Sequence, residues 1–187
     1  MGIQLLHAIY LGTRQLSLRE PRKVRVPADL AGVKLRMPGS REWLFLGNAL
    51  GANATPMPFT EVYLGLKTGT IDGQDNPLPT VKSAKFNEVT RQIVLTSHLV
   101  DALQIAMAAK TWNALASTDK TEVKKAAAKA AKFNDENRMR EEKELIESFR
   151  AQGIAITVPD VEAFRKTVQA AYLKSEYAEK WPRGLLE

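Results

Sequence analysis

The chain has 187 residues, of which 44% are hydrophobic, and a formal net charge of +6 at pH 7; it can bury the core of an ordinary domain, which excludes a disordered chain. The absence of cysteine excludes disulfides and thiolate chemistry. Basic and acidic residues are interleaved, as in RMREEKELIESFR, so we do not expect nucleic-acid binding. No window approaches the roughly 20 apolar residues that a transmembrane helix needs, so we do not expect insertion into a membrane.

The N-terminal part of the sequence predicts two strands and a helix. Residues 3–11 are a short apolar run rich in β-forming residues, which predicts a buried strand. A turn-rich segment leads into a second strand, VKLRM, which ends at the following proline and glycine. Ser40 is placed to cap a helix, and Gly51 to terminate it.

The next segment alternates between strand and helix signals. NATPMP is strand-like and leads to a helix with Thr60 as its expected N-cap, a Phe59–Leu64 hydrophobic staple and a stop at Gly69. TIDGQ is a predicted short strand, and Asn76 followed by proline is a second expected N-cap. This alternation predicts an α/β fold on a mainly parallel sheet.

The C-terminal part is dominated by one long predicted helix. Residues 91–109 contain two apolar strand candidates around the polar trio Thr96, Ser97 and His98. A helix is expected from about residue 117 to 152, apolar at both ends and polar in the middle, which suggests that it bridges two packed bodies. IAITV predicts a final strand, and Asp160 opens the last helix. We therefore divide the chain into an α/β lobe, 1–116, and a bridging segment, 117–187.

Motifs along nearly the whole chain resemble those of a known family of receptors. VKLRMPGS, the stretch from 51 to 78, KFNEV and TSHLV resemble the second lobe of the solute-binding proteins of TRAP (tripartite ATP-independent periplasmic) transporters, the DctP family, and most of all its sialic-acid-binding members. The resemblance implies a periplasmic-binding-protein-like (type II-like) lobe whose long helix would bridge to a first lobe that this sequence largely lacks.

The same resemblance implies a function and a location. It implies an extracytoplasmic receptor that binds a small organic acid and delivers it to the membrane subunits of a TRAP transporter. A periplasmic location follows from the resemblance, although the first fifteen residues lack the features of a secretory signal, which we expect on a missing N-terminal part. The alternatives are an interaction or regulatory domain with the same lobe and, third, an enzyme. No motif or carboxylate pair indicates catalysis, and no metal or cofactor is predicted.

Five residues are candidates for ligand binding. Arg36 lies at the end of a predicted strand, just before a helix N-terminus, and this arrangement suits the binding of an anion. The same pattern would also be found for a surface arginine at the edge of a sheet. Resemblance assigns Arg36 to the ligand carboxylate, and Arg14 in GTRQ and Asn76 in DGQDNPL to further contacts with the ligand. It also places Phe59 in the pocket wall and His98 at the cleft.

The sequence departs from the sialic-acid-binding pattern at one place. Gly39 stands where those receptors carry asparagine, so an amide contact is lost and specificity for sialic acid is in doubt.

Overall fold

The structure, a computed structural model, describes residues 2–182 and contains one six-stranded mixed sheet in the order β3-β2-β4-β1-β5-β6. The strands are β1 (Ile3–Leu18), β2 (Lys34–Met37), β3 (Asn53–Pro56), β4 (Gly73–Pro77), β5 (Gln92–Ala108) and β6 (Ala155–Thr157). The α/β class is confirmed. Three strand pairs, β2–β3, β2–β4 and β5–β6, are parallel, whereas β1 runs antiparallel to both of its neighbours.

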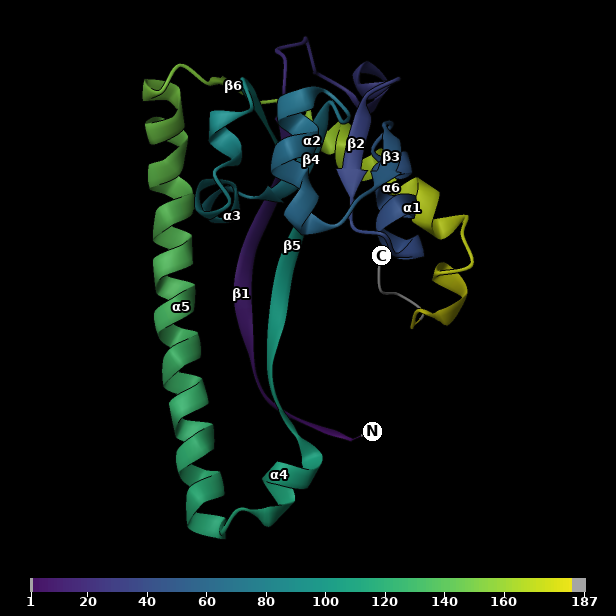
Figure 1. Cartoon of the computed structure of the whole chain (residues 1–187). Helices are drawn as coiled ribbons and strands as arrows, with labels where there is room; N and C mark the ends of the chain where they lie inside the picture. The colour runs from purple at the N-terminus through teal and green to yellow at the C-terminus, as the bar shows by residue number, and fades with distance from the viewer. Residues whose placement is uncertain (1, 183–187) are drawn as a thin grey trace.

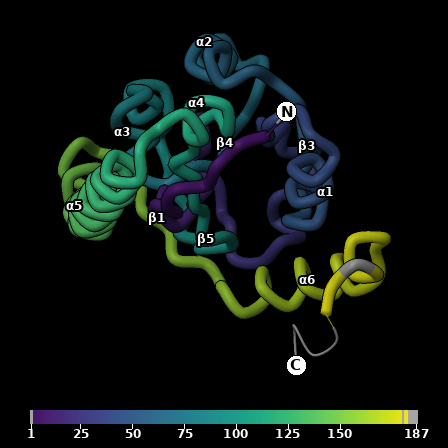
Figure 2. The backbone as a smooth tube through the Cα atoms, turned by 90° about the horizontal axis from the view of Figure 1, so that it is seen from below, coloured from purple at the N-terminus to yellow at the C-terminus, as the bar shows by residue number. Residues whose placement is uncertain are grey.

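Helices cover both faces of the sheet. They are α1 (Arg41–Ala49), α2 (Val62–Thr68), α3 (Leu78–Ser83), α4 (Ala109–Ala114), α5 (Ser117–Ala151) and α6 (Val161–Leu173). Short 3-10 helices lie at Pro27–Leu30, Phe59–Glu61, Phe86–Glu88 and Ala178–Lys180. In Figure 2, α3 and α5 lie on one side of β1 and β5, while α1 and α6 lie on the other.

The apolar core is divided by the sheet into two clusters. One packs under α1 and α6 and contains Leu16, Leu18, Val24, Leu30, Val33, Leu35, Met37, Leu46, Leu50, Ala52, Val94 and Phe164. The other packs under α2, α3 and α5 and contains Val62, Leu66, Ile71, Leu78, Val81, Phe86, Ile93, Leu145, Phe149 and Ile154. The adjacent residues Ile93 and Val94 point into different clusters because side chains alternate across a strand.

The long β1–β5 pair leaves the body of the domain as a two-stranded ribbon. It ends at α4, and α5 returns alongside it to the body (Figure 1). Residues 3–11 are a strand as expected, but they are not buried: Ile3 is 69% exposed, and the continuously buried part of β1 begins at Arg14. The expected burial was wrong because β4 pairs only with residues 14–18, at the end of β1.

Two expected helix starts were wrong. Thr60 lies inside the 3-10 turn, and α2 begins at Val62 with no side-chain cap. Asn76 lies within β4 and does not cap α3, which follows Pro77. The other termini agree with expectation: Ser40 Oγ accepts a hydrogen bond from the Trp43 backbone N–H (3.5 Å), and Asp160 caps α6.

The expected strands within 91–109 are one continuous strand, β5, with an irregularity in the middle. The register to β1 shifts between the pairs Arg14–Leu99 and Leu16–Val94, and Ser97 in the bulged segment has a positive φ of 46°. The Gln15 side chain holds this bulge, because its Oε1 accepts from the Ser97 backbone N–H (2.9 Å). The bulge turns the polar side chains beside it toward β1 and β4.

The polar middle of α5 has partners within this chain. Asn134 donates to the Tyr10 carbonyl, Asp135 accepts from the Tyr10 N–H and Arg138 donates to the Leu11 carbonyl. These side chains satisfy backbone groups on the edge of β1 that β4 does not reach. The polar side chains in the middle of α5 therefore bind the backbone of β1. The bridging of α5 to a second body stays a prediction.

The division at 116/117 also stays a prediction. β6, from the second segment, pairs with β5, and α6 packs Phe164 into the first core cluster. Both segments thus contribute to one sheet and its covering layers.

Candidate binding site for an organic anion

The five candidate residues lie on neighbouring elements at the centre of the sheet. Arg14, Arg36, Asn76 and His98 come from β1, β2, β4 and β5, and Phe59 from the 3-10 turn after β3. The strand register brings Gln15 opposite Asn76 and Arg36 opposite Gln74. The sheet therefore gathers residues that are up to 84 positions apart in the chain (98 − 14).

Arg14 is fully engaged with protein groups. Its side chain is 4% exposed; Nε–H and Nη2–H donate to the two carboxylate oxygens of Asp75 at 2.7 and 3.0 Å, and Nη1–H donates to Asp101 Oδ2 at 2.8 Å. The guanidinium also lies 4.4 Å from the ring centroid of Trp43. Such a bidentate, stacked arginine is held rigidly in place.

The buried ion pair shifts the pKa values of both partners. Burial acts to lower the pKa of Arg14, but hydrogen bonds and charge from Asp75 and Asp101 outweigh it and raise that pKa. Burial likewise acts to raise the pKa of Asp75, but hydrogen bonds from His98 and Arg14 lower it to about 2. Asp75 is thus a carboxylate throughout the physiological range.

Arg36 is buried without an anionic partner. Its side chain is 3% exposed, Nε–H donates to the Met57 carbonyl at 2.8 Å, and its guanidinium carbon lies 5.8 Å from the Phe59 ring centroid. Within residues 2–182 it makes no ion pair, and Nη1 and Nη2 have no hydrogen-bond partner. Burial lowers its pKa, the charge of Arg14 adds to this, and the charge of Asp75 opposes it. A carboxylate placed against this fork would gain two charge-assisted hydrogen bonds.

Phe59 lies beside this arginine, and Asn76 contacts Gln74, the register partner of Arg36. Phe59 is 45% exposed and its ring packs on Phe86 at 5.4 Å between centroids, while Leu64, its expected staple partner, is 63% exposed. Asn76 is 5% exposed, and one N–H of its amide donates to Gln74 Oε1 at 2.6 Å. That bond orients the amide and leaves its second N–H and its oxygen for other contacts.

His98 is held inside the protein network. Nδ1 lies 2.7 Å from Thr96 Oγ1, and Nε2 lies 3.2 Å from Asp75 Oδ2. Both ring nitrogens are therefore occupied. His98 also lines a cavity of about 350 Å³ between β5 and α6.

Sequence reasoning missed several polar residues that position the candidate side chains. Asp75, Gln74 and Asp101 were not singled out, nor was Trp43 as a partner of Arg14. The available signal was β4 itself: GQDNP is a fully buried central strand with three polar residues in succession, and such a strand needs partners for each.

The family is decided by comparison with known proteins. The model described as "Bacterial extracellular solute-binding protein, family 7" (DctP) matches residues 1–179. The chain belongs to this family. This confirms the family resemblance drawn from the motifs.

Family members of known name and structure agree with this membership. The sialic acid-binding periplasmic protein SiaP of Vibrio cholerae is 39% identical over 163 residues, 87% of this chain and 50% of SiaP. The 2,3-diketo-L-gulonate-binding periplasmic protein YiaO of Escherichia coli is 34% identical over 142 residues, 75% of this chain and 43% of YiaO.

A solved TRAP periplasmic solute-binding protein shares the fold closely. The protein from Roseobacter denitrificans with bound 3-deoxy-D-manno-oct-2-ulosonic acid (KDO) superposes with a TM-score of 0.95 at 51% identity, covering 98% of this chain and 61% of that protein. The chain thus spans about half the length of the curated relatives it matches. Across residues 2–182, no helix combines the length and apolar character needed to cross a bilayer.

Proposed function

We propose that this chain is a ligand-binding lobe of an extracytoplasmic solute receptor of a TRAP-type transporter and that it binds a small organic acid. The observation that carries this proposal is the contrast between the two buried arginines. Arg14 is neutralised by Asp75 and Asp101, whereas Arg36 is buried beside Phe59 with an open guanidinium fork. A buried arginine without a counter-ion is costly, and a ligand carboxylate would remove that cost.

The five candidate residues take complementary roles in this proposal. Arg36 binds the ligand carboxylate, and Asn76 adds an oriented amide. Phe59 forms an apolar wall. Arg14 and His98 act on the pocket through Asp75, which both of them contact. None of these roles is that of a nucleophile or a general base, which favours a receptor over an enzyme.

The ligand class follows from the relatives. Proteins of this family are named for or solved with sialic acid, KDO, 2,3-diketo-L-gulonate and L-galactonate, all of which are acids with several oxygen substituents. We infer a sugar-derived acid for this chain. In the complete receptor, the ligand would stabilise a closed state by contacting groups on both sides of the cleft, in the periplasm, before transfer to the membrane subunits.

Titration calorimetry with the complete, folded protein tests the proposal. KDO, L-galactonate and sialic acid serve as acidic ligands, and mannose as a neutral control. At least one acid should bind, and Arg36→Ala should weaken it by a few hundredfold to a few thousandfold, since truncating one partner of a buried ion pair costs about 3–5 kcal/mol. Arg36→Lys should weaken binding less, because it keeps the charge but loses the fork.

Arg41→Gln is the matched control for this titration. Arg41 lies on α1, is 82% exposed and pairs with Glu176, so its loss should leave the affinity unchanged. Equal affinities of Arg36→Ala and the parent protein would exclude the proposed role of Arg36. If no acid binds to the folded, complete protein, the interaction-domain alternative is favoured.

A further inference from the structure

A polar side chain of β4, Gln74, lies directly beside Arg36 on one face of the sheet. Leu16 and Leu35 belong to the core cluster under α1 and α6. Because side chains alternate along a strand, the next residues, Ser17 and Arg36, point to the opposite face, under α2, α3 and α5. The register pairs Gln74 with both of them, with Ser17 on β1 and with Arg36 on β2. Gln74 therefore lies between these two side chains.

Gln74 is hydrogen-bonded at both ends of its amide. Its Nε2–H donates to Ser17 Oγ at 3.0 Å, and its Oε1 accepts from Asn76 Nδ2–H at 2.6 Å. Asn76 is two residues farther along β4 and so lies on the same face. Gln74 and Ser17 are both 0% exposed, so no water competes for these bonds. The polar row of Ser17, Gln74 and Asn76 is thus a fixed hydrogen-bonded unit.

The surroundings of Gln74 do not require a polar side chain for stability. Ile71 and Leu78, just before and just after β4, belong to the core cluster on the same face. Replacing a buried hydrogen-bonded pair by apolar groups of the same shape is often nearly neutral for stability. An amide at position 74 does have one effect that an apolar side chain lacks, because its oxygen holds the Asn76 amide in a single orientation.

We propose that Gln74 is a positioning residue of the anion site at Arg36 and that it acts through Asn76. Its oxygen engages one N–H of the Asn76 amide, so that the second N–H and the oxygen of that amide are presented to the ligand. Ser17 anchors the other end of Gln74 and so sets where its oxygen lies. This inference rests on the proposed function, in which Asn76 contacts the ligand.

The first test needs no ligand. In NMR spectra of the complete, folded protein, the side-chain amide of Asn76 is identified as the pair of signals that Asn76→Ala lacks. Gln74→Met removes the acceptor and keeps the length of the side chain. In this variant the Asn76 signals should shift, and their protons should exchange faster with water. Ser17→Ala removes only the anchor and should produce a smaller change of the same kind.

The second test is a double-mutant cycle followed by titration calorimetry. The probe is the tightest-binding acid among KDO, L-galactonate and sialic acid. Gln74→Met should weaken its binding by about tenfold, because one hydrogen bond of the site loses its alignment. In an Asn76→Ala background the same substitution should weaken binding by less than about twofold, because no amide remains to be positioned. A merely structural role of Gln74 would weaken binding equally in both backgrounds.

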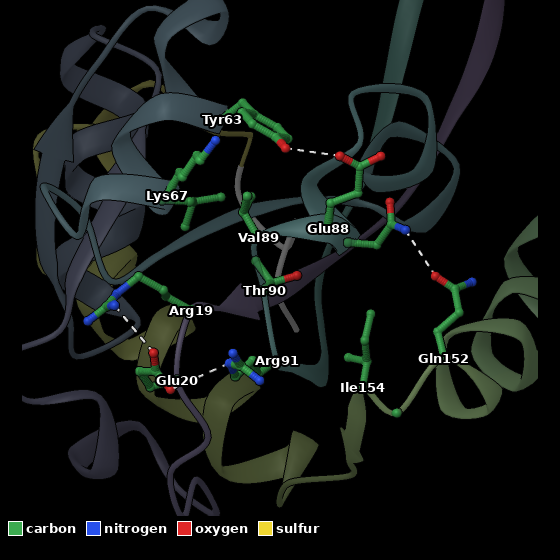
Figure 3. Close-up of a pocket in the computed structure, with 13 residues that line it drawn as sticks. Arg19, Glu20, Tyr63, Lys67, Glu88, Val89, Thr90, Arg91, Gln152 and Ile154 are labelled. Carbon is green, nitrogen blue, oxygen red and sulfur yellow. Dashed lines mark hydrogen bonds and ion pairs between the residues drawn. The ribbon is translucent and has the colours of Figure 1, made fainter.

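Two other glutamines provide matched controls. Gln152 accepts from the Asn87 amide at 3.0 Å, the same kind of bond as in the polar row, but at a cavity where β1 ends and where β5 and β6 begin; Figure 3 draws this bond. Gln92 is 3% exposed in the same sheet, and its amide is also bonded at both ends. Gln152→Met and Gln92→Met should leave the acid affinity and the Asn76 signals unchanged.

Two results would overturn the proposal. One is a set of Asn76 signals that is identical in Gln74→Met and the parent protein. The other is equal weakening of acid binding by Gln74→Met with and without the Asn76 side chain. Circular dichroism melts establish that each variant is folded, and Ser17→Ala takes the place of Gln74→Met in the cycle if the latter does not fold. If no acid binds, the proposed function fails, whereas the NMR comparison still decides whether Gln74 positions the Asn76 amide.

Discussion

At the scale of single residues, the fate of a buried charge depends on whether a partner reaches it. Arg14 and Arg36 are almost equally buried, yet Arg14 has two carboxylates and Arg36 has a single carbonyl. Arg14 and its carboxylates are a permanent part of the folded structure, because removing either partner would leave an unpaired charge in the interior. The second leaves a charge whose partner can come from outside.

Asp75 should make stability depend on acid pH. Its pKa is about 2 in the folded chain against an ordinary 3.8, so its stabilising contribution is present above about pH 4 and is lost as the pH falls through 2. The expected contribution is about 2 kcal/mol. Asp75→Asn should lower the free energy of unfolding at pH 7 by about 3 kcal/mol, because Arg14 loses its bidentate partner.

The measurement is urea unfolding followed by tryptophan fluorescence between pH 7 and pH 2. The gap in free energy between the parent chain and Asp75→Asn should narrow toward pH 2. Asp119→Asn, at an exposed position at the start of α5, is the control and should follow the parent chain closely. A gap that stays constant with pH would show that Asp75 does not titrate as described.

At the scale of elements, β1 and α5 are held together by polar side chains acting on backbone. Glu142 is central: Oε1 accepts from the Thr13 N–H at 2.6 Å, and Oε2 accepts from the Tyr10 hydroxyl at 2.8 Å. β1 approaches so closely here that Gly12, with φ of 139°, has no room for a side chain; an added Cβ would lie 2.5 Å from Glu142 Oε1 and from Pro77 Cβ. The close approach requires a glycine.

Gly12→Ala should therefore be strongly destabilising. Gly32→Ala is the matched control, because Gly32 also has a positive φ, 79°, but nothing lies within 4 Å of an added Cβ. We expect a loss of about 1 kcal/mol at Gly32 from backbone strain and at least about 2 kcal/mol more at Gly12 from the added clash. Chemical unfolding at neutral pH measures both, and equal losses would show that Glu142 and Pro77 can move away from Gly12 without cost.

At the scale of the whole molecule, the β1–β5 ribbon exposes apolar side chains beyond the body of the domain. Ile3, Leu5, Val100 and Leu103 are 69%, 52%, 67% and 48% exposed. A ribbon of two strands gains little stability by itself, and exposed apolar strands favour association. We expect this surface to be covered by protein in the functional receptor.

The 187-residue chain by itself should consequently associate in solution. Sedimentation velocity over a range of concentrations should show species larger than the 20.8 kDa monomer. Leu5→Lys with Val100→Lys should shift the distribution toward monomer, whereas Leu64→Lys, at a 63% exposed residue on α2, should not. A monomeric parent chain at all concentrations would contradict this expectation.

Features that depend on neighbours in the chain could be predicted from the sequence. The Ser40 cap, the left-handed Gly69 at the end of α2 and the extent of α5 were predicted because capping, glycine conformation and helical periodicity are local. The motifs likewise identified the family, and they placed Arg36 at the end of β2.

The pairing of polar groups, in contrast, could not be predicted from the sequence. Arg14 meets Asp75 and Asp101 across 61 and 87 residues, and the polar middle of α5 meets β1 across more than 120. The sequence does not indicate whether a charged side chain faces water or pairs with a group on a distant strand. The distinction between a neutralised Arg14 and an unpaired Arg36 arises from strand order and register, which are set by packing of the whole sheet.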